Sequence, residues 1–179
     1  DAGFDFVWID MEHSPLTLTD VMHHLMALRG TDCAPFVRVP WNEQGIIKPV
    51  IDLGPAGIIV PMVNTPKLAE AAVAACRYPP QGTRGCGLRR NIRYGATPVA
   101  DYLALSKHDP LVIAQIEHKD AVKNLDAILA VPGLDSICVG PYDLSGSLGK
   151  LTHVNDPDVT AVIDEICAKT LKTPLMLGA

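Results

Sequence analysis

Short apolar runs alternate along this chain with segments whose apolar residues recur at helical spacing, and this alternation constrains the fold most. The clearest run is 111–117 (LVIAQIE), in which five of the first six residues are apolar and the last is a carboxylate. A continuous apolar run of this length, directly after Pro110, is typical of a strand buried on both faces of a parallel sheet. The alternation therefore predicts a parallel α/β protein.

Helix boundaries carry their own signals. Thr65 followed by Pro66 predicts an N-cap and the first position of a helix, and Thr17 or Thr19 can cap the first helix, which Gly30 ends. Strands are predicted at 6–10, 36–39, 57–60, 111–117, 137–139 and 174–177, and helices at about 17–30, 44–53, 65–76, 98–107, 120–130 and 156–171.

Residues 77–97 form a long segment, rich in glycine and arginine, that has neither a helical nor a strand period. Loops of this length in compact domains are usually functional or mobile. Backbone amides in its GTRGCG stretch (82–87) could hold an anion, but glycine clusters of this kind are mostly turns. The segment is therefore expected to be a loop, and an anion site there has little support.

Polar residues at the ends of predicted strands distinguish between two parallel α/β architectures. Asp10, Arg38, Glu117 and Asp143 lie at or just after the ends of four strands. In a (β/α) barrel such ends converge on one mouth, whereas an open sheet spreads them along an edge. No GxGxxG follows the first strand, so a dinucleotide-binding fold has little support. A TIM-type barrel is predicted.

The composition limits the classes of function. The 179 residues, 48% of them apolar, are enough for one domain with a substantial core, so residues 1–179 are expected to form a single domain. The net charge of −5 argues against nucleic acid or an anionic membrane surface as the partner. No apolar run approaches the roughly 20 residues of a membrane helix. Five cysteines without CxxC spacing indicate reduced thiols in a cytoplasmic protein.

Glu117 and Asp143 are the candidate metal ligands. Each follows an apolar strand, Asp143 after a turn at Gly140 and Pro141. Hard divalent cations such as Mg²⁺ and Mn²⁺ prefer carboxylate oxygen, and Mg²⁺ is commonly held by one or two carboxylates with water and substrate oxygens. The alternative interpretation is two solvated acids at the starts of loops.

Asp10, His13 and Arg38 are the candidate catalytic residues. An aspartate beside a histidine can fix its tautomer and raise its basicity, which suits His13 to be a general base, although an Asp-His pair taken alone is more often structural. Arg38 lies inside the apolar FVRV strand and therefore needs an anionic partner, which could be Asp10, Glu12, or a substrate carboxylate or enolate. A metal, a base and an arginine together favour chemistry that passes through an enolate.

Six motifs in this order, IDMEHSP, FVRVPWN, IIVPMV, RYPPQGTRGCG, QIE and GPYDLS, give the chain a close resemblance to the HpcH/HpaI aldolase family, and to the metal-dependent pyruvate aldolases within it. The resemblance covers essentially the whole chain. It implies retro-aldol cleavage of a 4-hydroxy-2-oxo acid to pyruvate and an aldehyde, through an enolate stabilised by the metal. It does not indicate which aldehyde is released.

The resemblance also implies a fold and an assembly. The fold would be a (β/α)8 barrel, assembled as a homo-oligomer such as a hexamer or trimer. Family members have a strand before Phe6 and a further helix and strand after the last residue, so this chain is expected to lack the first and last strands of the barrel. A sheet with two open edges would remain, and such edges are prone to mispairing.

Roles for individual residues follow from the resemblance as well. Glu117 and Asp143 would hold Mg²⁺, Mn²⁺ or Co²⁺, and Arg38 would bind pyruvate and stabilise its enolate. His13, oriented by Asp10, would be the base that acts on the 4-hydroxyl of the substrate. The remaining contacts with the substrate would come from Gln115, Tyr142 and Asp143.

Two other classes of function remain. A citrate-lyase or malyl-coenzyme A lyase type of enzyme would share the barrel and the metal, but it needs a site for coenzyme A phosphates. A non-catalytic binding barrel would keep the pocket without turnover, and the intact set of charged candidates argues against it. The only basic cluster that could contact coenzyme A phosphates is formed by Arg84, Arg89, Arg90 and Arg93.

Overall fold

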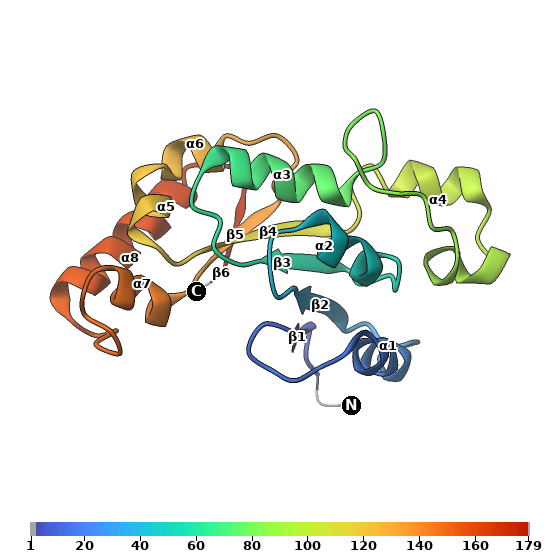
Figure 1. Cartoon of the computed structure of the whole chain (residues 1–179), viewed down its shortest axis with the longest axis horizontal. Helices are drawn as coiled ribbons and strands as arrows, with labels where there is room; N and C mark the ends of the chain where they lie inside the picture. Colours follow the sequence, from blue (N-terminus) through green and yellow to red (C-terminus); the bar gives the residue numbers. More distant parts are fainter. Residues whose placement is uncertain (1–2, 179) are drawn as a thin grey trace.

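The computed structural model describes residues 3–178, which form a curled parallel sheet with helices along its outer face (Figure 1). Each strand pairs in parallel with the next strand along the chain. The six strands of this part of the chain are β1 (Phe6–Asp10), β2 (Ala34–Arg38), β3 (Gly57–Val60), β4 (Leu111–Ile116), β5 (Ser136–Val139) and β6 (Met176–Gly178).

The strand order decides the type of α/β fold. The order is β1-β2-β3-β4-β5-β6, without the reversal that creates the binding crevice of a doubly wound sheet. Because every crossover steps in the same direction, the sheet curls steadily and forms a six-stranded half-barrel. The predicted parallel α/β architecture of barrel type is confirmed at this level.

The first and third helices begin where local signals predict. Thr17 caps the first helix in a capping box with Asp20, so Thr17 is the cap rather than Thr19. Thr65 caps the third helix, and its hydroxyl accepts a hydrogen bond from the backbone of Leu68. The helices are α1 (Leu18–Ala27), α2 (Gln44–Ile51), α3 (Pro66–Cys76), α4 (Val99–Leu105), α5 (Lys119–Lys123), α6 (Leu125–Leu129), α7 (Pro141–Ser147) and α8 (Pro157–Thr170).

Two predictions of local structure are wrong. The helix predicted at 120–130 is divided at Asn124 into α5 and α6, because Asn124 leaves helical geometry and its side chain donates to backbone carbonyls instead. No helix is predicted between 140 and 156, yet α7 starts at Pro141, a residue suited to the first helical position. The segment at 77–97 is a loop as predicted; it includes one short stretch of 3-10 helix, η1 (Arg90–Gly95), in which Ile92, Arg93 and Tyr94 have non-helical backbone angles.

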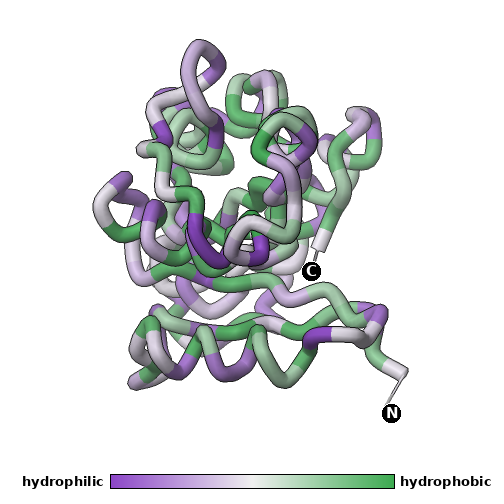
Figure 2. The backbone as a smooth tube through the Cα atoms, turned by 90° about the vertical axis from the view of Figure 1, so that its right-hand side faces the viewer, coloured by the Kyte–Doolittle hydropathy of each residue, from purple (hydrophilic) through white to green (hydrophobic). Residues whose placement is uncertain are grey.

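The two faces of the sheet differ in what covers them. Side chains on the convex face pack against α1–α3, α6 and α8 in one large apolar core. The concave face carries a smaller apolar cluster of Phe36, Ile59, Ile113 and Cys138. Helices in Figure 2 change between green and purple around their turns, as expected for one buried and one solvated side. Because both faces of the sheet are mainly apolar, the polar side chains of the strands lie mostly at the strand ends.

Two further observations concern whole-chain properties. Within residues 3–178, every helix is too short or too polar to cross a membrane. The five cysteines, Cys33, Cys76, Cys86, Cys138 and Cys167, are all free thiols, as predicted. Burial raises the pKa of Cys138 to about 12, so this thiol on the concave face stays protonated and unreactive at neutral pH.

Candidate active site

The candidate site lies at the carboxyl-terminal edge of the sheet. Asp10 and Arg38 are the last residues of β1 and β2 and lie opposite each other in the register of the two strands. Glu117 directly follows β4. Because parallel strands all point the same way, these three side chains come to the same edge, although they are far apart in sequence.

Arg38 is held by two carboxylates. Its Nε and Nη2 donate to the two oxygens of Asp10 at 2.9 and 2.7 Å, the forked geometry that suits guanidinium and carboxylate. Its Nη1 lies 3.0 Å from Glu12 Oε2. Although burial lowers the pKa of Arg38, the contacts with Asp10 and Glu12 raise it overall, so the guanidinium remains charged. The expectation that Arg38 needs an anionic partner is confirmed, and it has two.

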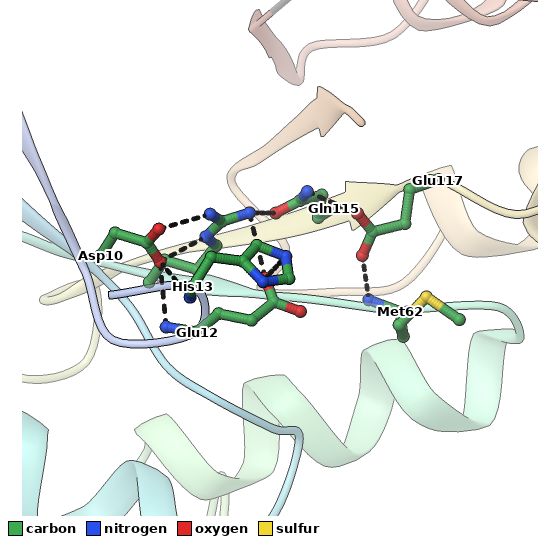
Figure 3. Close-up of polar contacts among 7 residues, drawn as sticks. Asp10, Glu12, His13, Met62, Gln115 and Glu117 are labelled. Atoms are coloured by element: carbon green, nitrogen blue, oxygen red, sulfur yellow. Dashed lines mark hydrogen bonds and ion pairs between the residues drawn. The ribbon is translucent and has the colours of Figure 1, made fainter. Parts of the chain in front are cut away.

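A chain of polar contacts leads from Arg38 to Glu117 (Figure 3). Arg38 Nη1 donates to Gln115 Oε1 at 3.4 Å, and Gln115 Nε2 donates to Glu117 Oε2 at 2.5 Å. The other oxygen of Glu117 accepts from the backbone N–H of Met62 at 2.7 Å. Gln115 lies in β4 and Glu117 directly follows that strand, two positions further on, so both side chains face the same side of the sheet. Gln115 thus fixes the position of Glu117 relative to Arg38.

Glu117 carries a buried charge that lacks a cationic partner. Its exposed fraction is 1%, and within residues 3–178 it forms no ion pair. Burial raises the pKa of its carboxyl group; the Met62 N–H opposes this rise, and the negative charges of Glu12 and Asp143 add to it. An acid in such surroundings is suited to bind a cation, because the cation would supply the missing positive charge.

Glu12 is the site residue that the motif analysis undervalued. Its pKa is raised chiefly by burial, and the charges of Asp10 and Asp143 add to the rise. Its Oε2 is buried and, apart from ion-pair contacts with Arg38 and His13, has no hydrogen-bond partner among residues 3–178. In the sequence it appeared only as one possible partner of Arg38. Its place between Asp10 and His13 is the signal that marks it.

His13 and Asp143 lie at the open rim of the site. The His13 side chain is 64% exposed, and its Nε2 is 3.8 Å from Glu12 Oε2. Asp10 contacts the backbone N–H of His13, not the ring, so the ring is nearer to Glu12 than to the acid expected to orient it. Asp143 and Tyr142 are exposed in the first turn of α7, and Asp143 is close enough to raise the pKa of Glu12 and Glu117.

The donors at this edge fit a hard divalent cation only in part. No three histidine, cysteine, aspartate or glutamate side chains within the described range are grouped closely enough to hold a metal by themselves. Glu117 and Asp143 supply two carboxylates on one rim, and the buried, unpaired charge of Glu117 needs a counter-charge. This donor set suits Mg²⁺ or Mn²⁺, which retain water and substrate oxygens.

Gly140 allows the chain to pass over Glu117. A Cβ atom at Gly140 would lie 2.5 Å from Glu117 Oε2 and 2.9 Å from Gln115 Nε2. The backbone at Gly140, with φ −100° and ψ 89°, is open to other residues, so the requirement for glycine is one of space. Glu117, Gln115 and the turn before α7 are therefore packed as one unit.

Replacing Gly140 with alanine is expected to weaken metal binding about 10- to 100-fold, as loss of outer-shell support does, and to destabilise the fold by about 1–3 kcal/mol through overpacking. Metal titration calorimetry and thermal unfolding measure the two effects. Gly45→Ala is the matched control, since a Cβ at Gly45 meets nothing within 4 Å. Equal metal affinity in the Gly140 variant and the wild type would contradict this account.

A singly wound parallel α/β fold with carboxylates and an arginine at the carboxyl ends of its strands defines the chain as an α/β protein of barrel type, with the candidate site at the carboxyl-terminal edge of its curled sheet. The comparison with known families agrees with this class. The chain belongs to the HpcH/HpaI aldolase/citrate lyase family, whose model matches residues 1–175. The resemblance noted from the six motifs is thereby confirmed.

Three relatives illustrate the match. The chain is 42% identical over 172 residues to a hydroxypyruvate/pyruvate aldolase of Roseobacter denitrificans, covering 96% of this chain and 66% of the relative. It is 44% identical over 165 residues to a 5-keto-4-deoxy-D-glucarate aldolase of Escherichia coli, covering 92% and 64%. A crystal structure of a family protein from Burkholderia cenocepacia superposes with a TM-score of 0.90 at 34% identity, covering 98% and 70%. The chain spans about two thirds of the length of these curated relatives.

Proposed function

We propose that the protein is a metal-dependent aldolase that cleaves a 4-hydroxy-2-oxo acid into pyruvate and an aldehyde. The observation that carries the proposal is the buried, unpaired carboxylate of Glu117 on the same edge as the Arg38 fork. Two relatives with more than 40% identity are named as aldolases, which supports this reaction over others. The aldehyde half of the substrate stays open.

The reaction needs a base and a group that stabilises negative charge. The proton of the 4-hydroxyl leaves, the bond between C3 and C4 breaks, and its electron pair forms the enolate of pyruvate. His13, exposed at the rim, is proposed to take the proton at its ring nitrogen. Arg38 is proposed to stabilise the enolate with its guanidinium, whose orientation Asp10 and Glu12 fix before substrate binds.

Glu117 and Asp143 are proposed to hold the divalent cation, Mg²⁺, Mn²⁺ or Co²⁺. When bound, the ion would act as a Lewis acid toward the oxygens of the 2-oxo acid. Gln115 would keep Glu117 in place through its hydrogen bond and would line the pyruvate pocket. Tyr142, exposed beside Asp143, would contact the substrate carboxylate from the first turn of α7.

Several features of the whole protein belong to the same proposal. The six parallel strands are proposed to be part of an eight-stranded barrel, since the chain spans about two thirds of the length of its curated relatives. Residues 1–179 are proposed to act as one domain within it, in a cytoplasmic homo-oligomer such as a hexamer or trimer. The net charge of −5 supports a small-molecule substrate rather than nucleic acid.

The test is a coupled assay of pyruvate release across 4-hydroxy-2-oxo acids of different chain length, each with Mg²⁺, Mn²⁺ or Co²⁺. We expect turnover that EDTA abolishes and that added metal restores, because the buried charge of Glu117 then has its counter-ion. Release of pyruvate at the same rate with and without EDTA would contradict the metal-dependent mechanism. Absence of release from every substrate would favour a non-catalytic barrel.

A citrate-lyase or malyl-coenzyme A lyase type of reaction is the second candidate, because the family description includes citrate lyase. Such an enzyme must hold the phosphates of coenzyme A. Arg84, one of the four arginines considered for that task, is buried and contacts Asp52 and Tyr102. Assays with acyl-coenzyme A thioesters beside free 2-oxo acids separate the two reactions.

A further inference from the structure

A hollow of about 540 Å³ lies at the amino-terminal end of the strands, opposite the candidate active site. Its walls come from the end of α1, the start of β2, the turn between α2 and β3, and η1. The segment between α3 and β4 contributes η1 and extends beyond this end of the sheet together with α4 (Figure 1). None of the proposed catalytic or metal-binding residues lines this hollow.

The hollow is lined by positive charge. Arg29, Arg90 and Arg93 belong to its lining, and no aspartate or glutamate does. This is unusual in a chain with a net charge of −5, and it follows from residues 77–100, which contain five arginines and no acid. The concentration of charge is therefore local and faces a concave surface.

These three arginines are unpaired in the described structure. Arg38, Arg77 and Arg84 each form an ion pair with a carboxylate, whereas Arg29, Arg90 and Arg93 form none within residues 3–178. The Arg90 side chain forms one hydrogen bond, from its Nε to the carbonyl of Leu53 at 3.0 Å. Its two Nη groups have no hydrogen-bond partner among residues 3–178. The donors that a phosphate could use are free.

The backbone that presents Arg93 is strained but well supported. Arg93 and Tyr94 both adopt left-handed conformations, with φ of 52° and 55°, which is rare for consecutive residues that carry a Cβ. The turn is held by hydrogen bonds from the backbone N–H of Tyr94 to Arg89 and from that of Thr97 to Ile92. The Tyr94 side chain is 75% exposed and also lines the hollow.

We propose that this hollow binds a small molecule that carries a diphosphate group. Guanidinium groups match phosphate oxygens in a forked geometry, and three arginines balance the charge of a diphosphate. The volume is within the range of small-molecule pockets. The exposed ring of Tyr94 offers a surface on which a flat organic part could stack. The proposal does not depend on the proposed aldolase reaction.

The test is isothermal titration calorimetry of purified protein, free of divalent cations, with ADP, inorganic pyrophosphate and adenosine. We expect saturable one-to-one binding of ADP and pyrophosphate, and none of adenosine. In the Arg29→Ala/Arg93→Ala variant the affinity is expected to fall at least about tenfold. Arg89→Ala is the matched control, because Arg89 is exposed in the same segment but does not line the hollow. Tyr94→Ala separates the two ligands, since it should weaken ADP only.

Three outcomes would overturn the proposal. The first is that neither ADP nor pyrophosphate binds with saturation. The second is an equal loss of affinity in Arg89→Ala, which would indicate attraction to general positive charge. The third is loss of binding in Arg38→Gln with none in Arg29→Ala/Arg93→Ala, which would place the anion in the candidate active site. Thermal unfolding of each variant confirms that it is folded at the temperature of the titration.

Discussion

Replacing Glu117 with glutamine is expected to lower metal-dependent pyruvate release at least about 1,000-fold, since a Lewis-acidic ion contributes several kcal/mol and about 1.4 kcal/mol is a factor of ten. Glutamine keeps the shape of the side chain, and its oxygen can still accept the hydrogen bond that the Met62 N–H donates at 2.7 Å. Its NH2 group then faces Gln115 Nε2 and cannot accept the hydrogen bond that Glu117 accepts there. It removes the charge that would hold the ion. Steady-state pyruvate release over a titration with Mn²⁺ or Mg²⁺ measures the loss.

Stability measurements separate this effect from unfolding. The pKa of Glu117 is raised in the folded protein, so the folded state binds this proton more tightly than the unfolded state does. As the pH rises above the ordinary glutamate range, ionisation of Glu117 therefore destabilises the metal-free protein. Glutamine removes that cost but gives up the hydrogen bond that Gln115 Nε2 donates, so metal-free Glu117→Gln should unfold close to the wild-type temperature. Metal should raise the melting temperature of the wild type but not of the variant. Glu70→Gln, an exposed change on α3, is the control. A metal-induced shift retained in Glu117→Gln would exclude Glu117 as a ligand.

The strands and their ends could be predicted because burial leaves a direct trace in the sequence. A strand covered on both faces has to be apolar throughout, and β3, β4 and β5 are buried along nearly all of their residues. Where such a run meets a charged residue, the strand ends, and this placed Glu117 at the carboxyl-terminal edge. Arg38 was found by the same reasoning, as a charge inside an apolar run.

The partnerships within the site could not be predicted, since they depend on strand register and side-chain direction. Nothing in the sequence separates Asp10 from Glu12 as the partner of Arg38, and both contact it. The parallel register of β1 and β2 sets Asp10 opposite Arg38, within reach of its guanidinium group. The ring of His13 lies toward Glu12 because the backbone turns after β1, an effect of loop geometry that single residues do not encode.

Short helices were the other failure. Helix α7 has seven residues, with a sequence of PYDLSGS, too short and too rich in serine and glycine to show a period. Its formation places Asp143 in a first turn and not directly at a strand end, which is the main change to the predicted site. The pairing of Glu117 with Asp143 as metal ligands stays a prediction, and the charge of Asp143 raises the pKa of Glu117.

Replacing Arg38 with alanine is expected to reduce turnover about 100- to 1,000-fold, the range found when a preorganised donor to a developing oxyanion is removed. It should also destabilise the fold by about 2–4 kcal/mol, because Asp10 and Glu12 would keep buried negative charge without a partner. The side chains involved are only 13–21% exposed, so solvent screens the pair weakly. Pyruvate release and denaturant unfolding measure the two losses.

The pH dependence of the stability loss distinguishes a lost ion pair from a lost volume. Burial raises the pKa of Asp10, but the hydrogen bonds from Arg38 and from the backbone N–H of Glu12 lower it overall. The ion pair therefore stabilises the fold fully above the pKa of an unfolded aspartate, near 4, and progressively less as the pH falls below it. The difference between the wild type and Arg38→Ala should therefore shrink toward pH 3. Arg38→Lys should recover part of the stability and little of the activity, because one ammonium cannot form the fork. A stability difference that stays constant from pH 7 to pH 3 would show that packing against Trp8, whose ring lies 5.3 Å from the guanidinium, outweighs the charge.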